Sequence, residues 1–281
     1  LPAGLLEAGA THSFQSNVSV GDNATFEALG ETIIAKTFDN KGIAIVNKKL
    51  TVTEQTTNTG ALTIGSGASA TFSSSVDNQA GGTFTSAGET TIAAGGFKNA
   101  GTADLGGNLK ITAGGFSNTA GNANVNGTMS ITSGGMTISG GQVTLKKAAK
   151  ATIGTTNGTV KLSDNGILDL TQGGTLDLGT NGKYEQTGGT LNANLDIQGT
   201  TGTIKELTGG NATDGVKVTG GKLNFTTQSN NPAGSDIQLK TGTNGGGTAQ
   251  NIVSNSGLTA ADVTINGRQA GYITNIATYT L

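Results

Sequence analysis

The side chains able to carry acid–base or metal chemistry are few in this chain and lie far apart. The single histidine, His12, and the single arginine, Arg268, stand near opposite ends of the 281 residues, and there is no cysteine. A catalytic site needs several such groups gathered in one place, and thiolate metal ligands are excluded. We therefore predict no catalytic residue, no metal site and no cofactor, and we interpret His12 as an ordinary surface histidine.

Three aspartates share one local pattern, because each stands between two large apolar residues: Asp169, Asp177 and Asp196. In a strand this alternation points the carboxylates outward. One interpretation is a carboxylate row that binds Ca²⁺ or serves a carbohydrate-active β-helix enzyme. However, the chain lacks the Gly-Gly-x-Gly-x-Asp calcium repeat and has no Trp to bind sugars. We favour solvated charge, and the enzyme remains an alternative function.

The densest basic cluster is formed by Lys146, Lys147 and Lys150. Contact with anionic glycans or lipopolysaccharide is one interpretation, and a solvated corner that discourages lateral aggregation is the favoured one. The net charge of -2 leaves no basic stripe for a phosphate backbone, so nucleic acid is not an expected partner. No apolar run approaches the roughly 20 residues of a membrane span, and no transmembrane segment is expected.

A repeat of about twenty residues organises the chain. The triplets Phe97-Lys98-Asn99 and Phe116-Ser117-Asn118 recur, with Val76-Asp77-Asn78 and Phe38-Asp39-Asn40 as earlier copies. Later in each unit an isoleucine returns at the same place, in a row of three: Ile92, Ile111 and Ile131. Short runs of alternating apolar residues, separated by Gly and Asn, indicate about three short strands in each repeat.

These observations predict an all-β fold, a parallel β-helix (β-solenoid) with rungs of about 20 residues and three short strands. Stacked rungs share a narrow core that no single rung could bury alone. The constant offset between the aromatic or Val residue and the asparagine predicts a ladder of stacked amides at one corner. The residues expected to form these structural rows are Asn40, Asn78, Asn99, Asn118, Phe97, Phe116, Ile92, Ile111 and Ile131.

The repeat also divides the chain into segments. Residues 1–37 lack its clean form and are predicted to be an N-terminal cap or assembly segment, because the first rung of a solenoid exposes strand edges. Residues 38–227 are predicted to hold the repeats, 228–247 a loop insertion, and 248–281 terminal rungs or a C-terminal cap. The chain begins at Leu1 rather than Met, as expected of a processed form or an excised fragment.

The units 97–111 and 116–131 resemble the repeats of filamentous haemagglutinin-type adhesins and of autotransporter passenger domains. The similarity is best over 38–54 and 76–135 and looser to about residue 225. The resemblance implies a right-handed parallel β-helix on the outside of a Gram-negative cell, secreted or held at the surface, with a role in adhesion or self-association. The chain shows no recognisable secretion or translocation domain, so the resemblance leaves the export route open.

We therefore expect an extracellular structural and adhesive β-solenoid and not an enzyme. Its expected partners are copies of itself, joined head to tail into a filament, and cell-surface glycans. An open stack favours such polymers, since each end offers unpaired backbone groups and a slice of apolar core. A viral tail-fibre segment, usually trimeric, is a further alternative.

Overall fold

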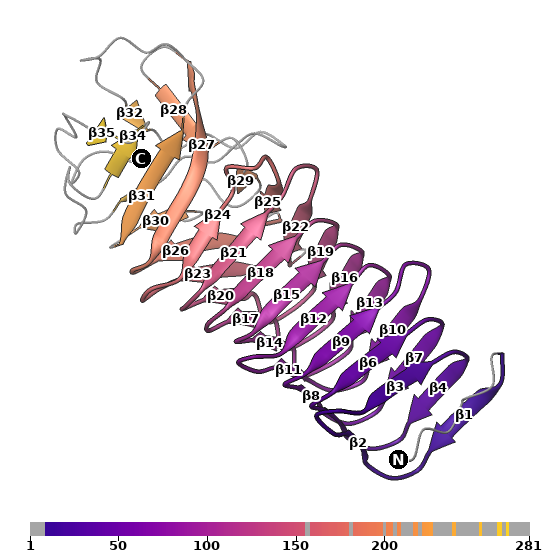
Figure 1. The fold of residues 1–281 in the computed structure, drawn as a ribbon. Helices are drawn as coiled ribbons and strands as arrows, with labels where there is room; N and C mark the ends of the chain where they lie inside the picture. Colours follow the sequence, from indigo (N-terminus) through magenta and orange to yellow (C-terminus); the bar gives the residue numbers. More distant parts are fainter. Residues whose placement is uncertain are drawn as a thin grey trace. The chain divides into compact units, whose positions relative to one another are not determined.

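The computed structural model of the protein contains two compact units, residues 1–134 and 135–281. The described residues are 9–154, 158–179, 182–198, 201–204, 207–208, 216–218, 221–226, 238–239, 253–254, 263–265 and 268–269, with side chains described as far as residue 194 and for 221–224. The described residues show a parallel β-solenoid of about nine turns, with turns of about 20 residues, three sheets and no helix (Figure 1). The predicted fold class is confirmed.

In unit 1 each turn contributes one strand to each of three sheets. Sheet A runs through β1 (Thr11–Phe14), β4 (Glu31–Ile34), β7 (Lys49–Val52), β10 (Ser69–Phe72), β13 (Glu89–Ile92), β16 (Asn108–Ile111) and β19 (Thr128–Ile131). Sheet B runs through β2 (Val18–Val20), β5 (Phe38–Asn40), β8 (Thr56–Asn58), β11 (Val76–Asn78), β14 (Phe97–Asn99) and β17 (Phe116–Asn118). Sheet C runs through β3 (Thr25–Ala28), β6 (Ile43–Val46), β9 (Ala61–Ile64), β12 (Thr83–Ser86), β15 (Thr102–Leu105) and β18 (Asn122–Val125).

Unit 2 has the same pattern of parallel strands along three sheet paths. One sheet path holds β22 (Lys150–Ile153), β25 (Thr175–Asp177) and β29 (Leu207–Thr208). A second holds β20 (Met136–Ile138), β23 (Thr159–Leu162), β26 (Lys183–Gln186), β30 (Val216–Val218) and β33 (Val253–Ser254). The third holds β21 (Gln142–Leu145), β24 (Ile167–Asp169), β27 (Thr190–Gln198), β31 (Lys222–Thr226), β34 (Val263–Ile265) and β35 (Arg268–Gln269). Two antiparallel pairs also occur, β27 with β28 (Thr201–Ile204) and β34 with β35, while β28 pairs in parallel with β32 (Gln238–Leu239).

Period-two alternation sets which side chains fill the core. In β13 the residues Thr90 and Ile92 are buried, whereas Glu89 and Thr91 point outward. The strands lie in exact register from turn to turn, so each inward position becomes a row: Ile92 pairs with Ile111, and Ile111 with Ile131. The predicted isoleucine residues therefore form one buried row in sheet A.

Large and small core residues alternate within each turn. Phe97 on sheet B shares its turn with Ala103 on sheet C, whereas the preceding turn pairs Val76 with Phe84. All four side chains are fully buried. The ring of Phe97 lies 5.0 Å from that of Phe84 and 5.6 Å from that of Phe116 (centroid distances). The narrow core thus keeps a nearly constant volume, which close packing requires.

The predicted cap at residues 1–37 differs from what the described part of that segment contains. From residue 11 onward it already consists of strands of the same solenoid, since β1 pairs with β4 and β2 with β5 in parallel register. The corners here lack the Gly-Gly pairs of later turns, which weakens the repeat signal in the sequence. The predicted loop insertion at 228–247 lies outside the described residues except for β32. Of the predicted terminal segment, β33 and β34 add parallel strands to β30 and β31.

Candidate functional site

The predicted asparagine ladder is a continuous chain of side-chain hydrogen bonds in unit 1. Asn40, Asn58, Asn78 and Asn99 each donate from Nδ2 to the Oδ1 of the asparagine one turn later, ending at Asn118, and each bond is 2.7 Å long. All five side chains are fully buried at the end of their sheet B strands. The amides also hold the next corner, because Asn78 Nδ2 reaches the carbonyl of Thr102 at 2.9 Å.

Two residues of this corner system escaped the sequence prediction. Asn58 was missed because its triplet, Thr-Thr-Asn, lacks the aromatic or Val residue that marked the other copies. In unit 2, Gln186 ends β26 and its Nε2 donates to the carbonyl of Lys222 at 3.2 Å. Its Oε1 accepts from the hydroxyl of Tyr184 at 2.9 Å, and burial raises the pKa of that phenol. Both side chains are buried, so this pair is a structural element of the core.

The outward positions of sheet A form two parallel rows of polar side chains. One row holds Ser69, Glu89 and Asn108 at the first position of β10, β13 and β16, and registers place them directly beside one another. The second row holds Thr71 and Thr91, followed by Lys110. Neighbours within a row are one strand apart, about 4.8 Å. This face therefore offers hydroxyl, amide and charged groups at a regular spacing.

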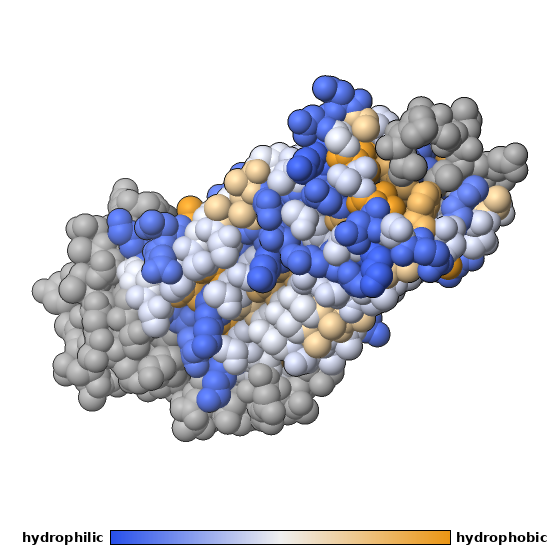
Figure 2. Space-filling model, turned by 90° about the horizontal axis from the view of Figure 1, so that it is seen from below, coloured by the Kyte–Doolittle hydropathy of each residue, from blue (hydrophilic) through white to orange (hydrophobic). Residues whose placement is uncertain are grey.

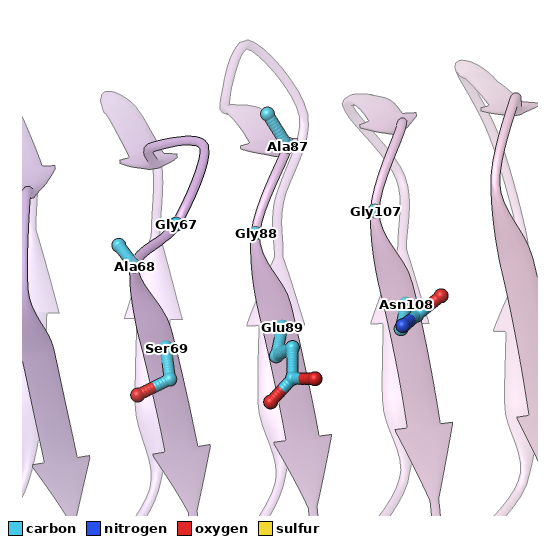
Figure 3. A pocket seen from close by; sticks show the side chains of 8 residues that line it. All are labelled: Gly67, Ala68, Ser69, Ala87, Gly88, Glu89, Gly107 and Asn108. Atoms are coloured by element: carbon cyan, nitrogen blue, oxygen red, sulfur yellow. The ribbon is translucent and has the colours of Figure 1, made fainter.

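An open hollow of about 470 Å³ lies where this face meets the corner from sheet C. Its walls are Gly67, Ala68, Ser69, Ala87, Gly88, Glu89, Gly107 and Asn108 (Figure 3). It arises from unequal corners: residues 65–68 make a longer, hydrogen-bonded turn, in which Ala68 N donates to the carbonyl of Gly65 at 3.0 Å. The corners at Ala87-Gly88 and Gly106-Gly107 are only two residues long.

Two glycines form the floor of the hollow, where adjacent corners stack closely. A Cβ on Gly88 would collide with the carbonyl of Ala68, and one on Gly107 would collide with that of Gly88. The floor is supported from inside, because Ser86 Oγ donates to the Gly88 carbonyl at 3.3 Å and lies 2.8 Å from Thr90 Oγ1. The backbone of adjacent corners therefore stacks directly, and the polar side chains that project beside it are Ser69, Glu89 and Asn108 (Figure 3).

The aspartates considered as a carboxylate row do not form one. Asp169 ends β24 and Asp177 ends β25, in different sheets of unit 2, and the side chain of Asp196 lies outside the described side chains. Asp169 Oδ1 accepts from the backbone N–H of Thr171 at 2.9 Å and from its hydroxyl at 2.6 Å. Asp177 Oδ1 accepts from the N–H of Gly179 at 2.9 Å. Both carboxylates thus fasten the corner that follows their own strand.

The remaining predicted candidates are placed on separate elements. His12 lies on β1, is half-buried and stands beside Thr32 in register. In the lysine cluster, Lys147 is exposed, while Lys150 forms an ion pair with Asp177 at 3.1 Å.

Within the part of the chain that the structure describes, no group of three or more His, Asp or Glu side chains is placed to hold a metal ion. Among those same residues, no helix has the length and apolar character needed to cross a bilayer.

Comparison of the chain with protein-family models, with curated proteins and with solved structures gave no match. The structure supports a β-solenoid of the kind found in β-helix repeat proteins. The finer resemblance to haemagglutinin-type and autotransporter repeats rests on the sequence units alone. What the protein does must therefore be inferred from its own surfaces.

Proposed function

We propose that this chain is a structural and adhesive β-solenoid, displayed outside a cell, which acts through many weak surface contacts and turns over no substrate. The observation that carries the proposal is the pair of in-register polar rows on sheet A, Ser69–Glu89–Asn108 and Thr71–Thr91–Lys110. Such a face presents polar groups at a regular spacing, so one partner can make several contacts at once. Weak contacts in series give strong attachment without any deep pocket.

The character of the surface supports this kind of contact. The face drawn in Figure 2 is mainly hydrophilic or neutral, with apolar residues in smaller patches. Around sheet C, side chains also bond to the preceding turn: Asn47, directly after β6, donates to Glu27 on β3 at 2.6 Å, and Asn124 on β18 donates to Asp104 on β15 at 3.0 Å. These bonds hold the side chains in fixed places before a partner arrives. A preordered surface loses less entropy on binding.

The buried framework supports the same proposal by fixing the spacing of the faces. The amide ladder from Asn40 to Asn118 joins successive turns of unit 1 at one corner. The strands of sheet A are held in register through β1 to β19. A regular scaffold of this kind suits the display of surface side chains better than binding by induced fit. Its strands are fixed by pairing with the neighbouring turns and cannot rearrange to close around a ligand.

End-to-end assembly belongs to the same proposal. In the described part of unit 1 the strands β1, β2 and β3 are the end strands of their sheets. Such strands carry backbone groups able to pair with another chain. Light scattering of the full chain over a range of concentrations tests this directly. Growth of long particles supports assembly, and a constant monomer mass at high concentration and neutral pH removes it from the proposal.

The adhesive function is tested by binding of the purified full chain to cells, to polysaccharides and to itself, with product analysis of the same polysaccharides. The expected result is retention on at least one of these surfaces with the polysaccharide left intact. Cleavage that is lost in Asp169→Asn or Asp177→Asn would replace the proposal with the carbohydrate-active enzyme. Absence of retention on every surface would remove the adhesive role.

A further inference from the structure

We infer that the hollow at the edge of sheet A is a subsite for a neutral glycan, with Glu89 and Asn108 as its recognition pair. The inference rests on the proposed adhesive function and names the ligand class of one part of the surface. It starts from the side chains that project beside the glycine floor: Ser69, Glu89 and Asn108, on three successive strands (Figure 3).

The Asn108 amide is oriented by its neighbour on the next strand. Thr128 Oγ1 donates to Asn108 Oδ1 at 2.5 Å, which fixes the oxygen on the side of β19. The amide nitrogen is thereby left for the side of the hollow, where Glu89 stands one strand away. Asn108 thus presents two N–H donors to the hollow and no acceptor.

The Glu89 carboxylate supplies the complementary acceptor. Among the described residues it has neither an ion-pair nor a hydrogen-bond partner, in contrast to Glu31 in the same row, which pairs with Lys49 at 2.6 Å. Ser69, on its other side, carries a hydroxyl that can donate or accept. The nearest lysine along the sheet, Lys110, occupies the outward position diagonal to Glu89, a place from which β neighbours lie roughly 7–8 Å apart.

The Glu89 carboxylate is an acceptor and the Asn108 amide nitrogen, one strand away, is a donor. Two neighbouring hydroxyls of a sugar can bind to both groups at once. One hydroxyl of a sugar donates to the carboxylate while the next accepts from the amide, and a third can meet Ser69. The bare floor at Gly88 and Gly107 lets a ring approach the backbone closely. The volume of about 470 Å³ falls in the range of small-molecule sites, roughly 300–1,000 Å³.

The charge of the hollow selects among carbohydrates. An acidic sugar would bring its own carboxylate against Glu89, and like charges at this range repel. A neutral sugar avoids that repulsion and still uses every polar group of the hollow. The subsite is therefore assigned to neutral glycans, and acidic polysaccharides should bind there more weakly.

The test is an array of neutral oligosaccharides, acidic polysaccharides and simple amines, probed with the full-length chain. Glu89→Gln removes the carboxylate and Ala87→Leu fills the hollow from an exposed position without removing a polar group. Asp77→Asn, on sheet B, is the matched control because it removes the same charge elsewhere. The expected result is binding to neutral sugars that falls about tenfold or more in both hollow variants and is unchanged in the control.

The other possible results contradict the neutral-glycan subsite, and they differ in whether the adhesive function is lost with it. Sugar binding that survives both hollow variants places the site elsewhere and leaves the adhesive function standing. A preference for acidic sugars or for amines refutes the ligand class. Adhesion to cells without any sugar binding removes the subsite alone, whereas loss of both adhesion and sugar binding removes the proposed function as well. Hydrogen exchange of the variants shows that their turns remain folded.

Discussion

Asn78 donates a 2.7 Å hydrogen bond from Nδ2 to the Oδ1 of Asn99, and neither side chain is accessible to solvent. The same bond links every consecutive pair of the ladder, which begins at Asn40 because the preceding turn places Val20 at that position. In consequence Asn40 Oδ1 is buried without a hydrogen-bond partner. In the ladder, therefore, the Oδ1 atom of every later asparagine accepts a hydrogen bond from the preceding turn, whereas that of the first, Asn40, accepts none.

Removal of a middle amide should cost more than removal of the first one. Asn78→Val leaves Asn99 Oδ1 newly unpartnered, and we expect the free energy of unfolding to fall by about 2–4 kcal/mol. Asn40→Val leaves Asn58 Oδ1 unpartnered but also removes the orphan atom that was already present, so a loss of only about 1 kcal/mol is expected. Urea titrations of the two variants measure the difference, and equal losses would show that the bonds between turns contribute little.

The alternation of large and small core residues predicts a rescue. Phe97→Val should lower the free energy of unfolding by about 1–3 kcal/mol, and Ala103→Phe alone should overpack the turn by a similar amount. Together they reproduce the Val76 and Phe84 pair of the preceding turn, so the double variant should be more stable than the sum of the single changes implies. Combining Phe97→Val with Ala123→Phe, one turn later, is the control and should give no rescue. Simple additivity in both combinations would contradict the volume argument.

Two glycines with nearly equal φ angles should respond differently to alanine. Gly67 has φ +78° and open space around its Cβ position, so Gly67→Ala should cost about 1–2 kcal/mol from backbone strain. Gly96 has φ +75°, but a Cβ there would collide with the carbonyl of Gly115 in the next corner. Gly96→Ala should therefore lower the unfolding midpoint in urea clearly further. Equal urea midpoints for Gly67→Ala and Gly96→Ala would mean that adjacent corners can move apart at little cost in free energy.

The ion pair of Glu31 and Lys49 should be visible in a titration. The hydrogen bond and the charge of Lys49 lower the pKa of Glu31 below 4.5. A depressed carboxyl pKa stabilises the fold above the unfolded pKa, and that stabilisation is lost as the pH falls through the folded value. NMR titration should show the Glu31 pKa rising in Lys49→Met, with no such change in Lys98→Met. An unchanged Glu31 pKa in the first variant would place the pair apart in solution.

The sequence was sufficient for the fold because a solenoid is specified locally. The returning Phe97 and Phe116, and the isoleucines in step with them, follow from contacts between neighbouring turns only. Residues 11–34 carry a weaker repeat signal, since their inward positions keep the alternation but their corners, at 15–17, 21–24 and 29–30, share no common sequence. Asn58 was hidden for a related reason, because threonine fills the position that phenylalanine or valine marks elsewhere.

The hollow could not be predicted in the same way. It depends on the longer corner at 65–68 standing next to the short corners at Gly88 and Gly107, a difference in loop length that the sequence shows only once the strands are aligned. The orientation of Asn108 depends further on Thr128, which is 20 residues away. Repetition thus predicts the framework, while departures from repetition create the candidate site.

The most direct test of the central claim is attachment of beads that carry the full chain, measured against shear on cells, on neutral glycan surfaces and on one another. Attachment should rise steeply with the density of chain on the bead, because many weak contacts act together, and should exceed that of beads carrying an unrelated protein of similar charge. Attachment no better than those controls on every surface, at every density, would contradict an adhesive solenoid.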